Sequence, residues 1–189
     1  QLNFNLKNFS VDSVVSPVDV RADINSSIEN GFLTLSAFNL SSGSTRLKGT
    51  GTAHLGQKKI DLKLQVTSAN LKTSLEPLGL NDISGSIQSK IHIKGNYTGP
   101  STKLELQTQN LSYQNFVLGN LMVSANSKPS GEFQINQLDL TNKNSHLHLK
   151  GHAQLFKPQT FNLTDQPIFE IHVESPEFNL GDFLPDVQG

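Results

Sequence analysis

Three histidines have the spacing at which a β-strand could offer ligands to a metal ion. His146, His148 and His152 occupy positions of the same parity, so an extended chain would project all three imidazoles from one face. Imidazole nitrogens bind zinc and copper, but we expect no Cys, Asp or Glu to complete a ligand set on that face. We therefore predict no metal and no cofactor, and interpret the histidines as part of a hydrated polar face.

Other reactive combinations of residues are missing from the sequence. The chain has no Cys, which excludes thiol nucleophiles and thiolate ligands. We find no Ser, His and Asp in the order of a triad, no paired acids in an apolar setting and no phosphate-binding loop. A net charge of −1 with 16% charged residues gives no basic stripe for nucleic acid. The sequence therefore predicts a protein that is not an enzyme and does not bind nucleic acid.

The elements that carry the histidines are alternating strands, and part of this pattern occurs twice. Residues 47–55 and 147–155 share the alternation of apolar and small residues at a displacement of 100, and residues 33–40 and 133–140 continue the match. In both copies the alternation slips by one residue, at Leu35-x-x-Phe38 and at Ile135-x-x-Leu138. A β-bulge would absorb such a slip and keep the apolar side chains on one face.

These patterns predict an all-β fold. With 35% hydrophobic residues and no Trp, the composition suits a sheet that is apolar on one face only. We predict roughly 13 to 17 antiparallel strands, which are too many for one flat open sheet, and an apolar face that either forms a thin core or faces a groove. Leucines at helical spacing before Pro77 and Gly79 leave room for one short helix near 71–80, and residues 178–185 have the same character. Either segment could cap an end of the sheet.

We expect residues 1–189 to form a single β-rich repeat region that is a fragment of a larger protein. The chain begins with Gln1 and has no apolar run of about 18 residues. An internal duplication is predicted at about 31–80 and 131–185. The linking residues 81–130 read as a meander of short antiparallel strands with prolines confined to the turns.

The middle of the chain resembles a known family. An Ile-Ser-Gly strand within residues 74–87 is followed by a strand that ends at Gly95, a linker with Pro100, and strands that begin near Asn110-Leu111, Phe116 and Gly131. This order resembles the AsmA-like and TamB-like proteins over roughly residues 30–184. The resemblance implies a periplasmic segment of a large envelope protein of diderm bacteria, anchored in the inner membrane and associated with outer-membrane assembly and phospholipid movement. It also implies the fold that we expect, a curled antiparallel sheet, taco-like or U-shaped, with an apolar concave groove.

Combined with the one-sided strands, the resemblance predicts a groove that holds phospholipid or another acyl-chain lipid. The residues expected to line it are Leu33, Leu35, Leu47, Leu55, Leu62, Leu64, Val66, Ile91, Ile93, Leu104, Leu106, Phe133, Ile135, Leu147, Leu149, Leu155, Ile171 and Val173. Gly49, Gly51 and Ala53 would leave room on this face for a ligand or an opposite wall. The alternative is that these aliphatic residues fill an ordinary β-sandwich core and that the glycines mark bends.

Two functional alternatives stay open at this point. The chain could be a structural or docking module that assists the assembly of outer-membrane β-barrel proteins by strand addition, without carrying lipid. It could also be an adhesin-like surface repeat, although that reading predicts shorter repeats and calcium or sugar sites that we do not find. Other partners expected from the family are neighbouring repeats of the same chain.

Overall fold

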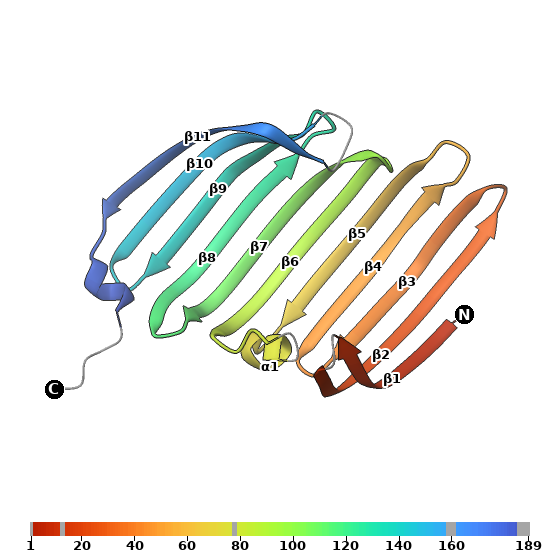
Figure 1. Cartoon of the computed structure of the whole chain (residues 1–189), viewed down its shortest axis with the longest axis horizontal. Coiled ribbons are helices and arrows are strands. Elements are labelled where there is room, and N and C mark those ends of the chain that lie inside the picture. The colour runs from red at the N-terminus through yellow and green to blue at the C-terminus, as the bar shows by residue number, and fades with distance from the viewer. Residues whose placement is uncertain (1, 12–13, 77–78, 158–161, 185–189) are drawn as a thin grey trace.

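The chain forms one antiparallel β-sheet, which we describe from a computed structural model. It describes the backbone of residues 2–11, 14–76, 79–157 and 162–184, and the side chains of residues 21–76, 79–154, 157 and 162–184. Eleven strands follow one another across the sheet in sequence order (Figure 1). They are β1 Leu2–Val11, β2 Val14–Glu29, β3 Phe32–Ser42, β4 Thr45–His54, β5 Lys59–Ser68, β6 Ile83–Asn96, β7 Gly99–Tyr113, β8 Phe116–Ser127, β9 Glu132–Asn142, β10 Ser145–Phe156 and β11 Leu163–Glu177.

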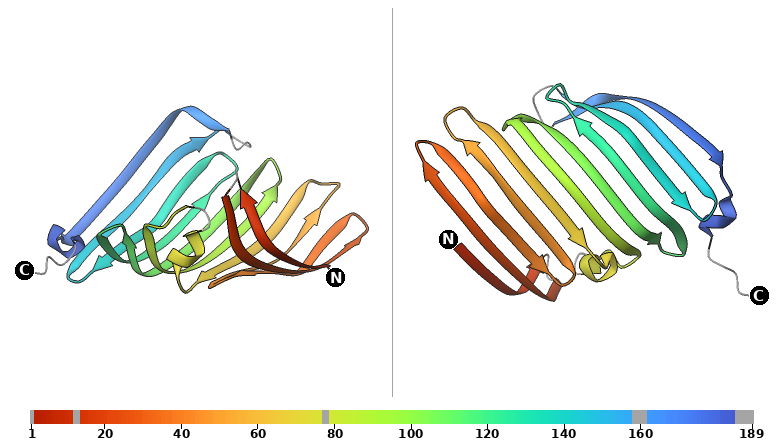
Figure 2. Two further views of the ribbon diagram at one scale, coloured as in Figure 1. Left: turned by 60° about the horizontal axis from the view of Figure 1, so that its bottom comes forward. Right: turned by 180° about the vertical axis from the view of Figure 1, so that it is seen from behind.

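The sheet is open and curled, and its described strands form a single layer (Figure 2). The predicted fold class, an all-β curled antiparallel sheet with one short helix near 71–80, is confirmed: that helix is α1 Leu71–Leu75. A 3₁₀ helix, η2 Leu180–Phe183, follows the last strand.

The sheet has fewer strands than predicted because each strand is longer. Segments that read as separate short strands between residues 81 and 130 join into β6, β7 and β8, which have 14, 15 and 12 residues. Residues with positive φ angles lie inside these long strands, where we expected turns. Gly119, expected in a turn, lies inside β8 with a φ of 84°, and Asn110 lies inside β7 with a φ of 51°. Pro100 is also a strand residue, paired with Gly95.

The predicted bulges occur where the alternation slips. On β3 the register shifts between Leu35 and Phe38, opposite Gly51 and Gly49 of β4. On β9, Leu138 pairs with Leu149 of β10, and Ile135 pairs with Gly151. Between these pairs, two residues of β9 therefore lie opposite one residue of β10. The extra residue lets apolar side chains return to the same face after the slip. The β2–β3 turn at Asn30-Gly31 has the positive φ angles, 50° and 78°, that this dipeptide favours.

Both short helices lie at the same end of the sheet, because each follows an odd-numbered strand of the meander (Figure 1). Asn70 caps α1 by accepting the Thr73 N–H, and Leu71 is buried. Asn179 caps η2 by accepting the Gly181 N–H, and Phe183 is buried. The order of three strands and a short helix thus appears twice, at β3–β5–α1 and β9–β11–η2. The internal duplication itself stays a prediction.

Candidate functional site

One face of the sheet carries an unbroken row of apolar and small residues, and we call this face the apolar face. The pairing of neighbouring strands defines the row, since directly paired residues project to the same side. It crosses ten strands from β2 to β11 and consists of Ile24, Phe38, Gly49, Leu64, Ile91, Leu104, Ala125, Ile135, Gly151 and Ile171. We call it the central row.

Most of the predicted groove residues lie on the apolar face, either in the central row or in parallel rows beside it. Those placed there by the strand register are Leu33, Leu35, Leu47, Leu62, Leu64, Val66, Ile91, Ile93, Leu104, Leu106, Phe133, Ile135, Leu147, Leu149, Ile171 and Val173. Their contact with lipid stays a prediction.

Two predicted residues stand apart from this set. Leu55 follows the last residue of β4, where its N–H donates to the carbonyl of Gly31 at 2.9 Å, and it is 49% exposed. The backbone of Leu155 belongs to β10, but its side chain lies outside the described residues.

The apolar face also contains residues that were not predicted to line the groove. Examples that pair into the rows are Ile24, Phe38, Leu40, Ile60, Leu121, Val123, Leu138, Leu140 and Phe169. They could have been predicted from the turns. A two-residue turn fixes the register of the two strands that it joins, so it shows which residues of the second strand share a face with those of the first.

Among the described side chains, little covers the apolar face. The buried hydrophobic residues are Leu71, Ala125, Ala153 and Phe183. Two of them are small residues between larger neighbours, and the other two belong to the short helices at one end. The larger aliphatic residues of β3 to β10 on this face are half-buried, so they pack sideways against one another. On the outermost strand, Phe169, Ile171 and Val173 are 59%, 55% and 53% exposed.

Space beside the glycines of β4 is taken up by the sheet itself. A Cβ atom on Gly49 would lie 2.8 Å from Cδ2 of Leu64, and one on Gly51 would lie 2.3 Å from the carbonyl oxygen of Asp61. The room expected for a ligand at these two positions is therefore occupied by the neighbouring strand β5. The two glycines therefore lie where neighbouring strands approach closely.

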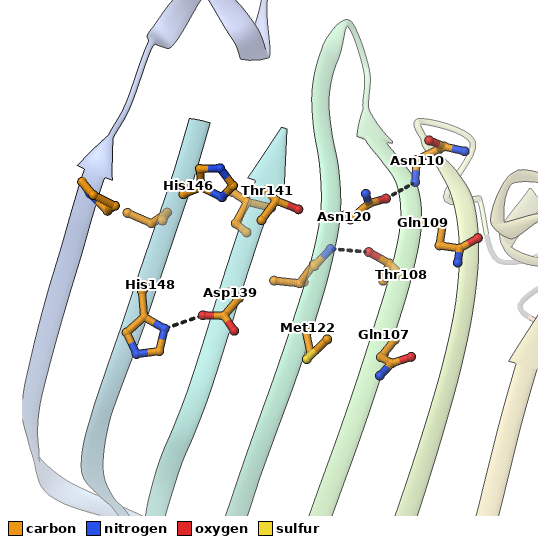
Figure 3. A pocket seen from close by; sticks show the side chains of 14 residues that line it. Gln107, Thr108, Gln109, Asn110, Asn120, Met122, Asp139, Thr141, His146 and His148 are labelled. Atoms are coloured by element: carbon orange, nitrogen blue, oxygen red, sulfur yellow. Dashed lines mark hydrogen bonds and ion pairs between the residues drawn. The ribbon is translucent and has the colours of Figure 1, made fainter. Parts of the chain in front are cut away.

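The opposite face is polar, and it contains a hollow of about 770 Å³ that is lined by residues of β7 to β11 (Figure 3). Gln107, Met122, Asp139 and His148 line it from one row of paired residues. Two side-chain oxygens at its rim accept backbone N–H groups: Asn120 Oδ1 from Asn110 at 3.1 Å and Thr108 Oγ1 from Leu121 at 3.1 Å.

The histidines lie on the polar face as predicted, and acids of neighbouring strands lie beside His148 and His152. His148 pairs with Asp139 on one side and Glu174 on the other, and its Nδ1 contacts the Asp139 carboxylate. His152 Nε2 lies 3.5 Å from Glu170 Oε2. Sequence parity could not reveal these acids because they come from neighbouring strands. Even so, the described residues contain no cluster of three His, Cys, Asp or Glu side chains that could hold a metal.

Two aspartates on the polar face have environments of the same kind. Asp61 of β5 contacts His92 Nε2 at 2.7 Å and Lys94 Nζ at 3.4 Å. The hydrogen bond with His92 lowers the pKa of Asp61 below its ordinary value, desolvation opposes this, and Lys94 adds to the lowering. The hydrogen bond with His148 likewise lowers the pKa of Asp139. Both aspartates are therefore held by hydrogen bonds to histidines within a hydrated face.

The comparison with known families agrees with this geometry. A family model described as "TamB, N-terminal domain" matches residues 1–157, which span β1 to β10. The chain belongs to the TamB family. The predicted resemblance to AsmA-like and TamB-like envelope proteins is thereby confirmed at the level of the family. No curated protein and no solved structure gives a significant match.

Membership in the TamB family makes the chain part of an envelope protein of that type. In the part of the chain that the structure describes, no helix has the length and hydropathy needed to cross a membrane.

Proposed function

We propose that this chain is a periplasmic segment of a bridge between the inner and outer membranes, which shields the acyl chains of lipids and so supports phospholipid transport and outer-membrane biogenesis. The full-length protein would be anchored in the inner membrane. The observation that carries the proposal is the central row, which runs uninterrupted from β2 to β11 with no second layer over it among the described residues.

The length of the sheet suits an acyl chain. Eleven strands at a spacing of about 4.8 Å extend over roughly 50 Å. One leaflet of a bilayer has a hydrocarbon thickness of about 15 Å, so the apolar face would accommodate about three acyl chains end to end. Each methylene that leaves water for this face is favoured by about 0.8 kcal/mol. The headgroup would remain hydrated at the open side.

The half-buried state of the apolar side chains supports this role. Leu64, Ile91 and Leu104 are neighbours across β5, β6 and β7 and are half-buried, so part of the area of each residue stays exposed. In a β-sandwich, a second sheet about 10 Å away would cover that area. A lipid tail would cover it instead and could slide from row to row, because aliphatic contacts have no preferred direction.

A pair of variants on adjacent residues tests the proposal. Leu64→Asp places a carboxylate in the central row, whereas Gln65→Asp places the same carboxylate on the polar face. We expect purified wild type and Gln65→Asp to carry phospholipid detectable by mass spectrometry, and Leu64→Asp to have lost most of it. Circular dichroism would confirm that both variants are folded. Wild-type protein that neither co-purifies with lipid nor takes up a fluorescent phospholipid would refute the proposal.

The docking alternative has its own supporting observation at the C-terminal edge. The 15-residue strand β11 is the outermost strand of the sheet, and its side chains are exposed at almost every position. An edge strand offers unpaired backbone groups to another strand, which could come from a neighbouring repeat of the same chain or from an outer-membrane β-barrel protein. If the segment acts by docking alone, full-length protein with a folded Leu64→Asp segment will keep full activity in the envelope.

A further inference from the structure

The polar face contains a second hollow, over β4 to β7, whose lining is rich in lysine. It has a volume of about 520 Å³ and is lined by Lys48, Lys63, Lys90 and Lys103 together with His92 and Glu105. We call it the lysine groove. It lies on the side of the sheet opposite the apolar face, because these residues alternate with Gly49, Leu64, Ile91 and Leu104 of the central row.

The four lysines form two rows with a channel between them. Lys48 and Lys90 belong to one row of paired residues, whose other members include Gln65 and Glu105. Lys63 and Lys103 belong to the next row, on either side of His92. Lysines of the same row are two strands apart, roughly 10 Å, and the rows are separated by two residues along each strand, roughly 7 Å. The channel therefore crosses the strands, with lysines alternating between its two walls.

Most of this positive charge is uncompensated. Glu105 is the one acid that lines the groove, and its carboxylate lies 4.0 Å from Lys90 Nζ with both side chains more than 70% exposed. Asp61, in the row beyond, is engaged by His92 and Lys94. Within the described residues, Lys48, Lys63 and Lys103 have no carboxylate within ion-pair distance.

The balance of charge differs between the two halves of the polar face. Over β9 to β11 this face carries Lys150 together with three acids, Asp139, Glu170 and Glu174, which lie against histidines. A chain with a net charge of only −1 thus presents a basic region next to an acidic one. Such separation focuses the field on the groove and attracts anions to it.

We propose that the lysine groove binds a linear anion that carries several phosphate groups. A linear ligand fits because the lysines lie along a channel and do not surround a single point. Phosphate fits because a lysine ammonium group binds it as a point charge with three rotatable donors. The sheet separates this site from the apolar face, so the two sites are occupied independently.

Inorganic tripolyphosphate, measured by isothermal titration calorimetry at low salt, is the direct probe, and orthophosphate is the comparison. We expect wild type to bind tripolyphosphate at least tenfold more tightly than orthophosphate. The triple variant Lys48→Gln, Lys63→Gln, Lys103→Gln should lose about tenfold or more in affinity, because each exposed charge contributes roughly a factor of two to five. The single variant Glu105→Gln should bind two- to fivefold more tightly, since it removes the competing carboxylate.

A second triple variant controls for net charge. Lys72→Gln, Lys128→Gln, Lys150→Gln removes the same charge from positions outside the groove, and we expect it to change the affinity less than threefold. Equal losses in the two triple variants, or equal affinities for tripolyphosphate and orthophosphate, would overturn the proposal. The substituted side chains in the groove are exposed, so folding should be retained, and circular dichroism would verify it. Lipid binding serves as an independent readout that the groove variants should leave unchanged.

Discussion

A Cβ atom on Gly51 of β4 would lie 2.3 Å from the carbonyl oxygen of Asp61 on β5. In the second half of the sheet, a Cβ atom on Gly151 of β10 would likewise lie 2.5 Å from the carbonyl oxygen of Glu170 on β11. Both glycines lie in rows of the apolar face, where the other members are mostly aliphatic. The close approach of backbones at these points explains why a small residue interrupts the row.

Replacing Gly51 by alanine should destabilise the protein. The new Cβ would meet backbone atoms of Asp61 and Leu62, which cannot move without shifting β5, so we expect a loss of about 1–3 kcal/mol in the free energy of unfolding. In Gly49→Ala the Cβ would meet Cδ2 of Leu64, the end of a flexible side chain, and the loss should be below about 1 kcal/mol. Urea denaturation measures both values. Equal losses would show that the backbone contact is not the cause.

Removing the Phe183 ring should release the cap at the C-terminal end of the sheet. Phe183 is 6% exposed and stacks on Phe178 with ring centroids 5.2 Å apart. We expect Phe183→Ala to cost about 3 kcal/mol locally and to speed the hydrogen exchange of the Asn179 amide, which donates to Ser145 Oγ at 2.8 Å. Leu180→Ala, at a position that is 65% exposed, is the matched control. Unchanged exchange in Phe183→Ala would contradict the packing role of the ring.

The aspartate–histidine contacts should stabilise the fold above mildly acidic pH. The folded-state pKa values of Asp61 and Asp139 are lowered by His92 and His148, whereas the unfolded carboxyl groups titrate near the ordinary value of about 3.9. Unfolded protein therefore binds protons at a higher pH than folded protein. The stabilisation is fully present above the unfolded pKa and is lost as the pH falls through the folded values.

The double variant Asp61→Asn, Asp139→Asn tests this linkage. We expect its urea midpoint to lie below that of wild type at pH 5 and 6, and the difference between the two proteins to shrink as the pH falls from about 4 to about 2. A constant difference across this range would show that ionisation of these carboxylates does not contribute. Because both side chains are about one-third exposed, the effect should also decrease with added salt.

If lipid tails lie on the apolar face, photo-cross-linking should distinguish the two faces residue by residue. A photoreactive side chain at Leu62, Ile93 or Leu149 would project from the apolar face, and one at the adjacent Lys63, Lys94 or Lys150 from the polar face. We expect phospholipid adducts at the first three positions and at least tenfold fewer at the other three. Similar yields on both faces would argue against a one-sided lipid site.

The parity of the sequence predicted which side chains share a face. Alternation in residues 47–55 and 147–155 sends Leu47 and Leu149 to the apolar face and His148 to the polar face, because successive side chains of a strand must point to opposite sides. The slip at Leu35-x-x-Phe38 predicted the bulge for the same reason. These inferences concern neighbouring residues along one strand, where local geometry alone decides.

Only the tertiary structure decided what lies next to each strand. The pairing of Asp139 with His148 and the close approach of Gly51 to Asp61 join different strands, and their register depends on every turn and bulge between them. The number of strands also depended on pairing, because a partner strand holds residues such as Asn110 and Gly119 in the ladder where local propensity favours a turn. The sequence determined the two faces of the sheet, and the packing of strand against strand determined how those faces are assembled.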